Sequence, residues 1–449
     1  MLFDTIVAKI TANGISAINV IRVSGPDSLD IVEKIYKGKS LRESQSHTIK
    51  YGFIHDEGDI IDEVLISVFK SPKSFTTEDT VEISCHGGNL VANEIIKLLI
   101  ANGARMAEKG EFTKRAYLNG RIDLTKAESI MDIVNAKTKA QIKMASLGLQ
   151  GEVYDLISSL QNETLQIIAN IEVNIDYPEY DDILVLSQEI IIPKIIDLID
   201  KIEIILKESE TGQIIKEGIK TVIVGKPNVG KSSLLNSLIK EDKAIVTEIS
   251  GTTRDLIEAE LNLDGIILKL IDTAGIRETD DYVEKIGIQR TKKAIEDCEL
   301  VLLVLDQSEE ITALDIELLS ITKNKTRIII KNKSDLGERI DLTGEHIINV
   351  STKTKTGLNT LSEEVKKLFV DERLLEEDKA ILSNTRQIGK LKETKIALED
   401  ALSAAKNNIP IDMVEIDLKK AWYSLGEITG QNSNEDLITT LFSNFCLGK

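Results

Sequence analysis

The chain has 449 residues, of which 42% are hydrophobic, 29% charged and 4% aromatic, a composition that suits about three folding units and argues against long disorder. A formal net charge of −19 argues against a surface that binds nucleic acid nonspecifically, so any nucleic-acid partner must be met by a local patch. The three cysteines give neither a disulfide framework nor a zinc spacing. With no leader-like start and no apolar run of spanning length, we expect a cytoplasmic protein without membrane attachment.

The first region, residues 1–118, is predicted to be an α+β domain. Strand-like segments alternate in it with helical ones; they are SAINVIRVSG, HTIKYGFIHD, DEVLISVFKS and DTVEISCHGG.

Two regions of long helical periodicity, 119–217 and 371–449, flank a central unit of different character. They include LTKAESIMDIVNAKTKAQIKMA, IIPKIIDLIDKIEIILKES and EIDLKKAWYSLGEIT, with almost no strand signal. We therefore expect one helical bundle domain formed by both regions, with the central unit inserted at a loop.

The central unit, 218–370, is predicted to be a Ras-like P-loop domain with a mostly parallel, doubly wound sheet. Its strand-like runs are TVIVG, IILKLID, VLLVLD, RIIIKNK and HIINVS. The segment LIEAELNLDGIILKLID predicts two strands joined by a tight turn at Asp264 and Gly265, so one edge strand should be antiparallel.

A phosphate-binding loop is predicted between the strand TVIV and the helix SSLLNSLIK. Its backbone N–H groups and the following helix N-terminus suit phosphates, Lys231 can reach the outer phosphates, and the Ser232 hydroxyl can ligate Mg²⁺. The predicted nucleotide-binding residues here are Asn228, Val229, Gly230, Lys231, Ser232 and Ser233. The alternative is a glycine-rich turn that matches the pattern by chance. The motifs described next argue against that alternative.

Two further motifs are predicted to contact Mg²⁺ and the terminal phosphate of the nucleotide. Asp272, Thr273, Ala274 and Gly275 follow the strand IILKLI, where a carboxylate can hold Mg²⁺ through water and the Gly275 amide can meet the phosphate. Upstream lies GTTRD, in which Thr253 is the candidate for the second hydroxyl ligand of Mg²⁺.

Guanine recognition is predicted at Asn332, Lys333 and Asp335, after the strand RIIIK. The Asp335 carboxylate can accept from N1–H and the exocyclic amino group of guanine, donors that adenine does not offer there, so an ATPase is the weaker alternative. Backbone contacts to the guanine carbonyl are expected from the tripeptide Ser351, Thr352 and Lys353.

The position after Gly275, where many small GTPases carry a water-positioning glutamine, is Ile276, which cannot polarise water. Another group must therefore act, and Glu284 in the acidic segment IRETDDYVEKIG is the candidate catalytic carboxylate. A solvated first-turn carboxylate that stabilises a helix dipole is the alternative for Glu284.

The chain resembles, over its full length, the tRNA-modification GTPase family MnmE, also called TrmE. The likeness rests on AIVTEISGTTRD, DTAGIRE followed by VEKIG, SFTTEDTVEISCHGG, GEFTKRAYLNGRIDLTKAE, LGEITG and the terminal FCLGK. The central unit would then be a TrmE-type G domain.

The resemblance implies a potassium-dependent GTPase. Members act with the flavoprotein MnmG, in a heterotetramer, to form 5-carboxymethylaminomethyluridine at the wobble position (U34) of certain tRNAs. The implied potassium ligands are Asn228, Thr247, Ile249 and Thr252, within a nucleotide-contacting segment that also includes Glu248, Ser250, Gly251 and Thr253. Hydrolysis would be driven by G-domain dimerisation, with potassium in the role of an arginine finger.

The resemblance also implies that the first domain forms a constitutive homodimer and binds a tetrahydrofolate derivative, in the 5-formyl or 5,10-methylene form. The matching positions are Arg22, Glu82, Arg121 and Lys449. Arginine and lysine can hold carboxylates or ring edges, and Glu82 can accept from pterin N–H groups. Surface ion-pair residues are the alternative at each position.

One other function fits the G motifs, a regulatory GTP switch in ribosome assembly. The helical host domain, the first domain and FCLGK argue against that alternative. Prenylation at Cys446 is rejected because Gly448 and Lys449 fit that signal poorly.

Overall fold

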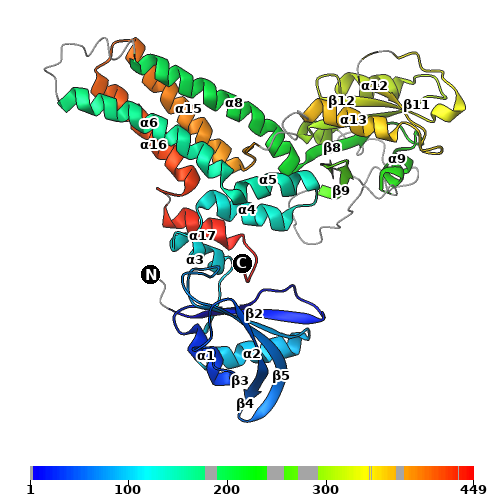
Figure 1. Ribbon diagram of the computed structural model, residues 1–449. Helices are drawn as coiled ribbons and strands as arrows, with labels where there is room; N and C mark the ends of the chain where they lie inside the picture. The colour runs from blue at the N-terminus through cyan, green and yellow to red at the C-terminus, as the bar shows by residue number, and fades with distance from the viewer. Residues whose placement is uncertain are drawn as a thin grey trace. The chain divides into compact units, whose positions relative to one another are not determined.

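The computed structural model in Figure 1 describes residues 4–176, 190–239, 257–271, 292–342, 344, 346–370, 379–432 and 434–449. The chain divides into two compact units. The first comprises the residues up to Met131, Gly148–Asn162 and Trp422–Lys449, and the second comprises Asp132–Leu147 and Glu163–Ala421. The four-part division at 118, 217 and 370 stays a prediction.

A mixed sheet with strand order β3-β4-β5-β6-β2-β1-β7 forms the main part of the first unit. Its strands are β1 (Ile6–Lys9), β2 (Ile18–Ser24), β3 (Tyr36–Gly38), β4 (Thr48–Asp56), β5 (Asp59–Phe69), β6 (Thr80–His86) and β7 (Arg105–Met106). All pairs are antiparallel except β1 with β7. The four predicted strand segments are thus confirmed as β2, β4, β5 and β6.

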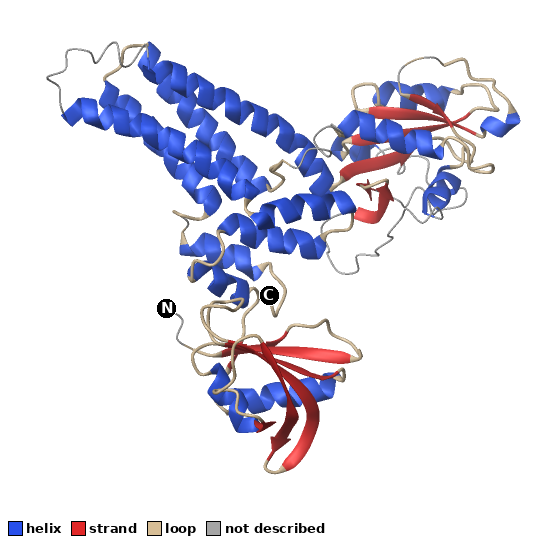
Figure 2. Ribbon diagram, viewed as in Figure 1, coloured by secondary structure: helices blue, strands red, loops and turns tan. Residues whose placement is uncertain are grey.

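Two helices cover one face of this sheet, α1 (Ser28–Ile35) and α2 (Asn89–Ala101) (Figure 2). The core forms because apolar side chains recur at helical spacing on both helices and at alternate positions on the strands. Val32 and Leu99 from the helices and Ile21 and Ile83 from the strands belong to this core and are fully buried. Each fully buried aliphatic side chain contributes roughly 1.5–3 kcal/mol.

The first unit also contains α3 (Glu111–Leu118), α17 (Glu435–Ser443) and most of α4 (Leu124–Asn135). A small apolar cluster joins them and includes Leu124, Ile438 and Phe442. The segment after α17 forms a bridge between Leu447 and Lys109. The end of the described chain therefore lies beside residues that precede α3.

Long helices form a bundle in the second unit, as predicted (Figure 1). They are α8 (Ile192–Glu217), α15 (Thr385–Lys406) and the greater parts of α5 (Lys139–Gln150), α6 (Glu152–Asp176) and α16 (Ile411–Thr429). Ion pairs join neighbouring helices, with Lys395 of α15 at 2.8 Å from Glu203 of α8 and Lys201 of α8 at 2.8 Å from Glu163 of α6. None of the helices that the structure describes is both long and apolar enough to cross a membrane.

One predicted helical stretch is interrupted. The periodic segment from Leu124 ends as α4 at Asn135, and α5 begins at Lys139. The break is stabilised locally, because Thr138 Oγ1 accepts from the Gln141 amide at 3.2 Å and Gln141 Oε1 accepts from the amides of Lys137 and Thr138 at 2.6 and 3.2 Å. Such a cap starts a new helix where apolar periodicity alone predicts continuation.

The second sheet has the order β13-β12-β11-β8-β10-β9. Its strands are β8 (Ile219–Val224), β9 (Ile257–Leu263), β10 (Ile266–Ile271), β11 (Leu300–Asp306), β12 (Arg327–Asn332) and β13 (Ile347–Asn349). All pairs are parallel except β9 with β10, which confirms the antiparallel edge strand. The turn between these two strands has φ of 48° at Asp264 and 100° at Gly265, as the tight hairpin requires.

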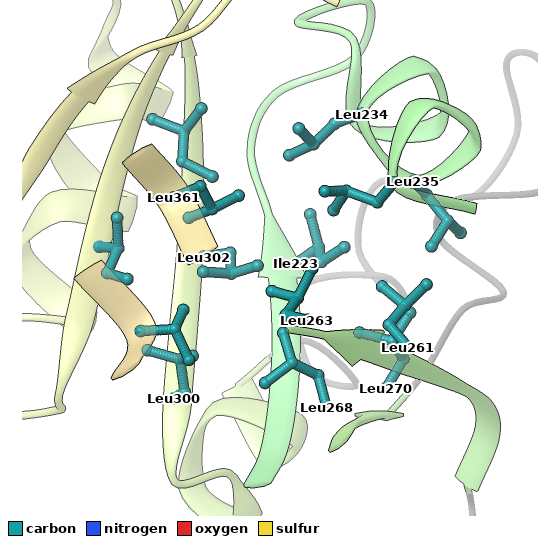
Figure 3. Packing of buried hydrophobic residues seen from close by; sticks show 14 of the residues in the cluster. Ile223, Leu234, Leu235, Leu261, Leu263, Leu268, Leu270, Leu300, Leu302 and Leu361 are labelled. Atoms are coloured by element: carbon teal, nitrogen blue, oxygen red, sulfur yellow. The ribbon is translucent and has the colours of Figure 1, made fainter. Parts of the chain in front are cut away.

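Helices α9 (Lys231–Leu238) and α13 (Leu358–Phe369) pack on this sheet, as does α12 (Ala313–Ile321). Figure 3 shows the packing of Leu234 and Leu235 from α9 and Leu361 from α13 with strand residues such as Leu302. β11 is buried along its whole length, as expected for a central strand covered on both faces. The packing of these helices on the sheet holds in place the carboxyl ends of its parallel strands, and the candidate site residues follow these ends.

Candidate functional site

The predicted phosphate loop connects β8 to α9. Burial lowers the pKa of the Lys231 ammonium group, which donates to the carbonyl oxygens of Gly225 at 2.8 Å and Lys226 at 2.9 Å. These contacts hold the charged group at the loop itself. Ser232 lies beside Lys231 in the first turn of α9, and Asn228 is exposed in the loop with a left-handed φ of 63°.

Gly230 connects the phosphate loop to the predicted guanine motif. It has a φ of 96°, and a Cβ atom there would collide with Nδ2 of Asn332. That same Nδ2 donates to the Val229 carbonyl oxygen at 2.8 Å, while Oδ1 of Asn332 is buried without a hydrogen-bond partner among the described residues. The two motifs, about a hundred residues apart in sequence, are therefore held together by the backbone of one and the amide of the other.

Replacing Gly230 with alanine is expected to weaken GTP binding by about tenfold, because alanine disfavours the left-handed conformation and its Cβ displaces Asn332. Equilibrium titration with a fluorescent GTP analogue measures the change. Gly265→Ala is a matched control, since Gly265 also has a positive φ but has open space where its Cβ would lie. Equal affinity in the Gly230 variant and the control would contradict this role.

The guanine motif begins at Asn332, the last residue of β12, and continues into the short helix η3 (Ser334–Leu336). Lys333 has a φ of 61° and pairs with Asp306, the last residue of β11. Burial alone would raise the pKa of Asp306, but hydrogen bonds from Lys333 and Ser308 hold it below its ordinary value. The buried carboxylate thus anchors the turn that carries the motif.

Asp335 is exposed after this turn, and Ser351 Oγ donates to its Oδ1 at 2.6 Å. This hydrogen bond lowers the pKa of Asp335, and Lys353 lowers it further, so the carboxylate is charged at neutral pH. Thr352 accepts from Ser237 of α9 through its carbonyl oxygen at 3.5 Å. The structure therefore brings Ser351, Thr352 and Asp335 to one end of the parallel strands, where the phosphate loop also lies.

Acidic groups around these motifs were missed by sequence reasoning. Lys226 of the phosphate loop is 2.9 Å from Glu309 and 3.5 Å from Asp315. Asp315 also completes a capping box with Thr312 at the start of α12. The position of Asp306 at a strand end was the only available signal, since ordinary helix capping explains Asp315.

Several predicted residues lie outside the described part of the chain. They are Thr247, Glu248, Ile249, Ser250, Gly251, Thr252 and Thr253, then Asp272, Thr273, Ala274 and Gly275, and the candidate catalytic Glu284. The predicted Mg²⁺ and K⁺ sets are therefore described only at Ser232 and Asn228. Their roles stay predictions.

A second cluster lies in the first unit, where Arg22 of β2 faces Glu82 of β6. The two residues are opposite in the antiparallel register. Nε and Nη2 of Arg22 lie 2.9 and 2.8 Å from the same Glu82 oxygen. Both predicted residues thus present donors and acceptors side by side, a pattern that suits the edge of a polar heteroaromatic ring.

Arg121 joins this cluster through Phe75, a residue that sequence reasoning missed. The guanidinium carbons of Arg22 and Arg121 lie 5.0 and 4.9 Å from the Phe75 ring centroid. Burial lowers the pKa of Arg121, and the nearby charge of Arg22 lowers it further. The motif SFTTED contains Phe75, but nothing in the sequence distinguished it from a packing residue.

Lys449 has its amide 3.2 Å from the Cys446 carbonyl oxygen, and a Cβ atom on the preceding Gly448 would meet Lys9 and Ile10 at the end of β1. β1 pairs with β2, with Ala8 opposite Arg22. The chain end therefore lies against the strand next to the one that carries Arg22. Cationic groups together with one carboxylate fit a ligand that has both carboxylates and ring N–H groups.

Comparison with known proteins gives matches along the whole chain. The sequence model of the MnmE helical domain matches residues 124–446, and that of the GTP-binding protein TrmE N-terminus matches residues 5–121. The chain is 51% identical to the tRNA modification GTPase MnmE of Acholeplasma laidlawii over 450 residues, covering all of both chains. It is 48% identical to the protein of that name from Lactococcus lactis subsp. lactis, covering 100% of this chain and 99% of that one.

Among solved structures, the G domain of the T. maritima FeoB iron transporter aligns with 33% of this chain and 97% of its own, at 28% identity and a TM-score of 0.25.

Proposed function

This chain belongs to the MnmE family of tRNA modification GTPases, and we propose that its GTP hydrolysis is potassium-dependent and serves the wobble position of tRNA. It is a GTP hydrolase that takes part in tRNA modification. With an MnmG flavoprotein it forms 5-carboxymethylaminomethyluridine at U34, as a cytoplasmic homodimer that joins MnmG in a heterotetramer. The observation that best supports this proposal is the phosphate loop with Asn228, held to the guanine motif by the Val229–Asn332 hydrogen bond.

The chain's own residues have the following roles in this proposal. Asp335 selects guanine, and Lys231 moves from the loop carbonyls to the outer phosphates. Ser232 and Thr253 would hold Mg²⁺, which would offset phosphate charge. Asn228, with Thr247, Ile249 and Thr252, would hold a potassium ion that would supply positive charge where negative charge develops on the phosphates. Glu284 orients the attacking water, because Ile276 cannot.

The first domain is proposed to bind the tetrahydrofolate derivative through Arg22, Glu82, Arg121 and Lys449. Glu82 would accept from pterin N–H groups while its pairing with Arg22 fixes its orientation. A one-carbon unit from such a ligand is chemically suited to extend carbon 5 of uridine. Binding of 5-formyltetrahydrofolate to the purified protein tests this part.

Potassium dependence is tested by steady-state GTP hydrolysis in potassium and in sodium at equal ionic strength. The rate in potassium should exceed that in sodium by about tenfold or more, because a fitted cation neutralises transition-state charge. Glu284→Ala should abolish most of the potassium-stimulated rate without loss of GTP affinity.

Glu278→Ala is the matched control for this experiment, since Glu278 lies in the same acidic segment and has no assigned role. Equal rates in the two salts would reject cation-assisted catalysis and favour an ordinary switch that needs an external activator. Equal losses in the two glutamate variants would reject the role of Glu284.

A further inference from the structure

The Phe75 ring lies against two guanidinium groups that come from distant parts of the chain. Arg22 belongs to β2 and Arg121 follows α3, yet both guanidinium carbons lie within 5.0 Å of the ring centroid. Arg121 also donates from Nη1 to the Phe75 carbonyl oxygen at 2.8 Å. One residue therefore contacts both arginines, and Arg121 contacts its ring and its backbone.

The loop that contains Phe75 is held by polar contacts of the next residue, Thr76. Thr76 is fully buried, its hydroxyl lies 2.6 Å from that of Ser24, and its carbonyl oxygen accepts from Asn119 Nδ2 at 2.7 Å. Thr77 has a left-handed φ of 66°. These contacts fix the backbone on one side of Phe75, and its half-buried ring packs against the apolar cluster that includes Ala8 and Phe112.

The charges around the ring are unequal. Arg22 is paired with Glu82, whereas Arg121 makes no ion pair within 4.0 Å with any residue that the structure describes. Two neighbouring guanidinium groups repel each other, and the negative face of an aromatic ring offsets part of this repulsion. The Phe75 ring thus allows the two positively charged guanidinium groups to lie close together. The Arg121 guanidinium is the one that can bind an anion.

We propose that Phe75 is a positioning residue that holds Arg22 and Arg121 together as a binding site for a ligand with both a carboxylate and a heteroaromatic ring. This inference rests on the proposed folate function for its ligand. The Arg22–Glu82 pair meets the ring edge, and Arg121 meets the anionic group. An aliphatic residue would leave the same backbone contacts but would not attract the two guanidinium groups.

The test compares Phe75→Leu and Phe75→Tyr with the unmodified full-length protein by calorimetric titration with 5-formyltetrahydrofolate. Phe75→Leu should bind about tenfold more weakly, since two cation–π contacts are lost, and Phe75→Tyr should bind within about threefold of the unmodified protein. Phe69→Leu is the matched control, because Phe69 is a half-buried phenylalanine of the preceding strand whose ring makes an edge-to-face contact with His47. Phe69→Leu should bind 5-formyltetrahydrofolate and hydrolyse GTP as the unmodified protein does.

A second readout does not depend on the ligand. Labelling of Arg22 and Arg121 by phenylglyoxal, followed by mass spectrometry, should be faster in Phe75→Leu than in Phe75→Tyr or Phe69→Leu. Unchanged labelling, or folate affinity equal in the leucine and tyrosine variants, would overturn the positioning role. Absence of folate binding in the unmodified protein, with labelling altered as expected, would reject the proposed ligand and keep the positioning role.

Discussion

Asp335→Asn is expected to weaken GTP binding by about 10³-fold and to allow binding of xanthosine triphosphate, since the amide keeps one acceptor but opposes the exocyclic amino group of guanine. Xanthine has a carbonyl oxygen at that position, to which the asparagine N–H can donate. The effect should be this large because Asp335 is a fixed acceptor. Ser351 holds one of its oxygens at 2.6 Å, and this hydrogen bond lowers the pKa of the carboxyl group, so that it is charged at neutral pH.

Competition between fluorescent guanosine diphosphate and unlabelled guanosine, xanthosine and adenosine nucleotides measures this change in specificity. Asp341→Asn is the matched control, because it is the same substitution at an exposed position shortly after the motif. An equal loss of affinity for all three kinds of nucleotide would show that Asp335 stabilises the loop and does not recognise the base. Retained preference for guanosine would show that Asp335 does not contact the base.

The second sheet and its nucleotide motifs could be predicted because each motif is contiguous and follows a strong strand. Five runs of β-branched and leucine residues predicted β8, β10, β11, β12 and β13, and a single Asp-Gly dipeptide predicted the turn before β10. Parallel strands place their carboxyl ends at one edge, so the phosphate loop and the guanine motif had to be close. The hydrogen bond between Asn332 and Val229 was not predictable, since it depends on a left-handed Gly230.

The first unit was less predictable at the level of contacts. The positions of Arg22, Glu82 and Arg121 came from family resemblance, and only strand register shows that Arg22 is opposite Glu82. Phe75 was missed because a phenylalanine in a loop looks like a packing residue until the two guanidinium groups are seen against it. Pairings across distant segments depend on tertiary structure, and propensity and periodicity contain no signal for them.

Arg115→Met is expected to destabilise the first unit by about 3–5 kcal/mol, because it removes a buried cation that pairs with the buried carboxylate of Glu111 and with Glu78 and Asp4. Arg115 is 1% exposed, and its guanidinium lies 2.7 Å from Asp4, 2.9 Å from Glu111 and 3.2 Å from Glu78. Methionine has a similar length and fills much of the space, so the loss is mainly electrostatic. Hydrogen exchange of the β1 and β2 amides in the full-length protein measures the change, which should speed exchange by about 10²–10⁴-fold.

Arg42→Met is the matched control, since Arg42 pairs with Asp30 at the surface and has a side chain 63% exposed. Its loss should cost at most about 1 kcal/mol. Similar exchange in the two variants would show that the Arg115 network contributes no more than a surface pair.

The pH dependence of exchange gives a separate check on the Arg115 network. Burial alone would raise the pKa of Glu111, but hydrogen bonds from Arg105, the Glu108 amide and Arg115 hold it below its ordinary value. A carboxyl group whose folded-state pKa is lowered contributes stability above its unfolded-state pKa, and this contribution is lost as the pH falls through the folded-state value.

In the unmodified protein, protection of β1 should therefore decline only below the ordinary glutamate range. In Arg115→Met the burial of Glu111 is opposed by fewer donors, so its folded-state pKa lies nearer the unfolded-state value, and the loss of protection on acidification should be smaller and complete at a higher pH. An unchanged pH profile would mean that Arg105 alone fixes the charge of Glu111, and that Arg115 stabilises the fold through its contacts with Asp4 and Glu78.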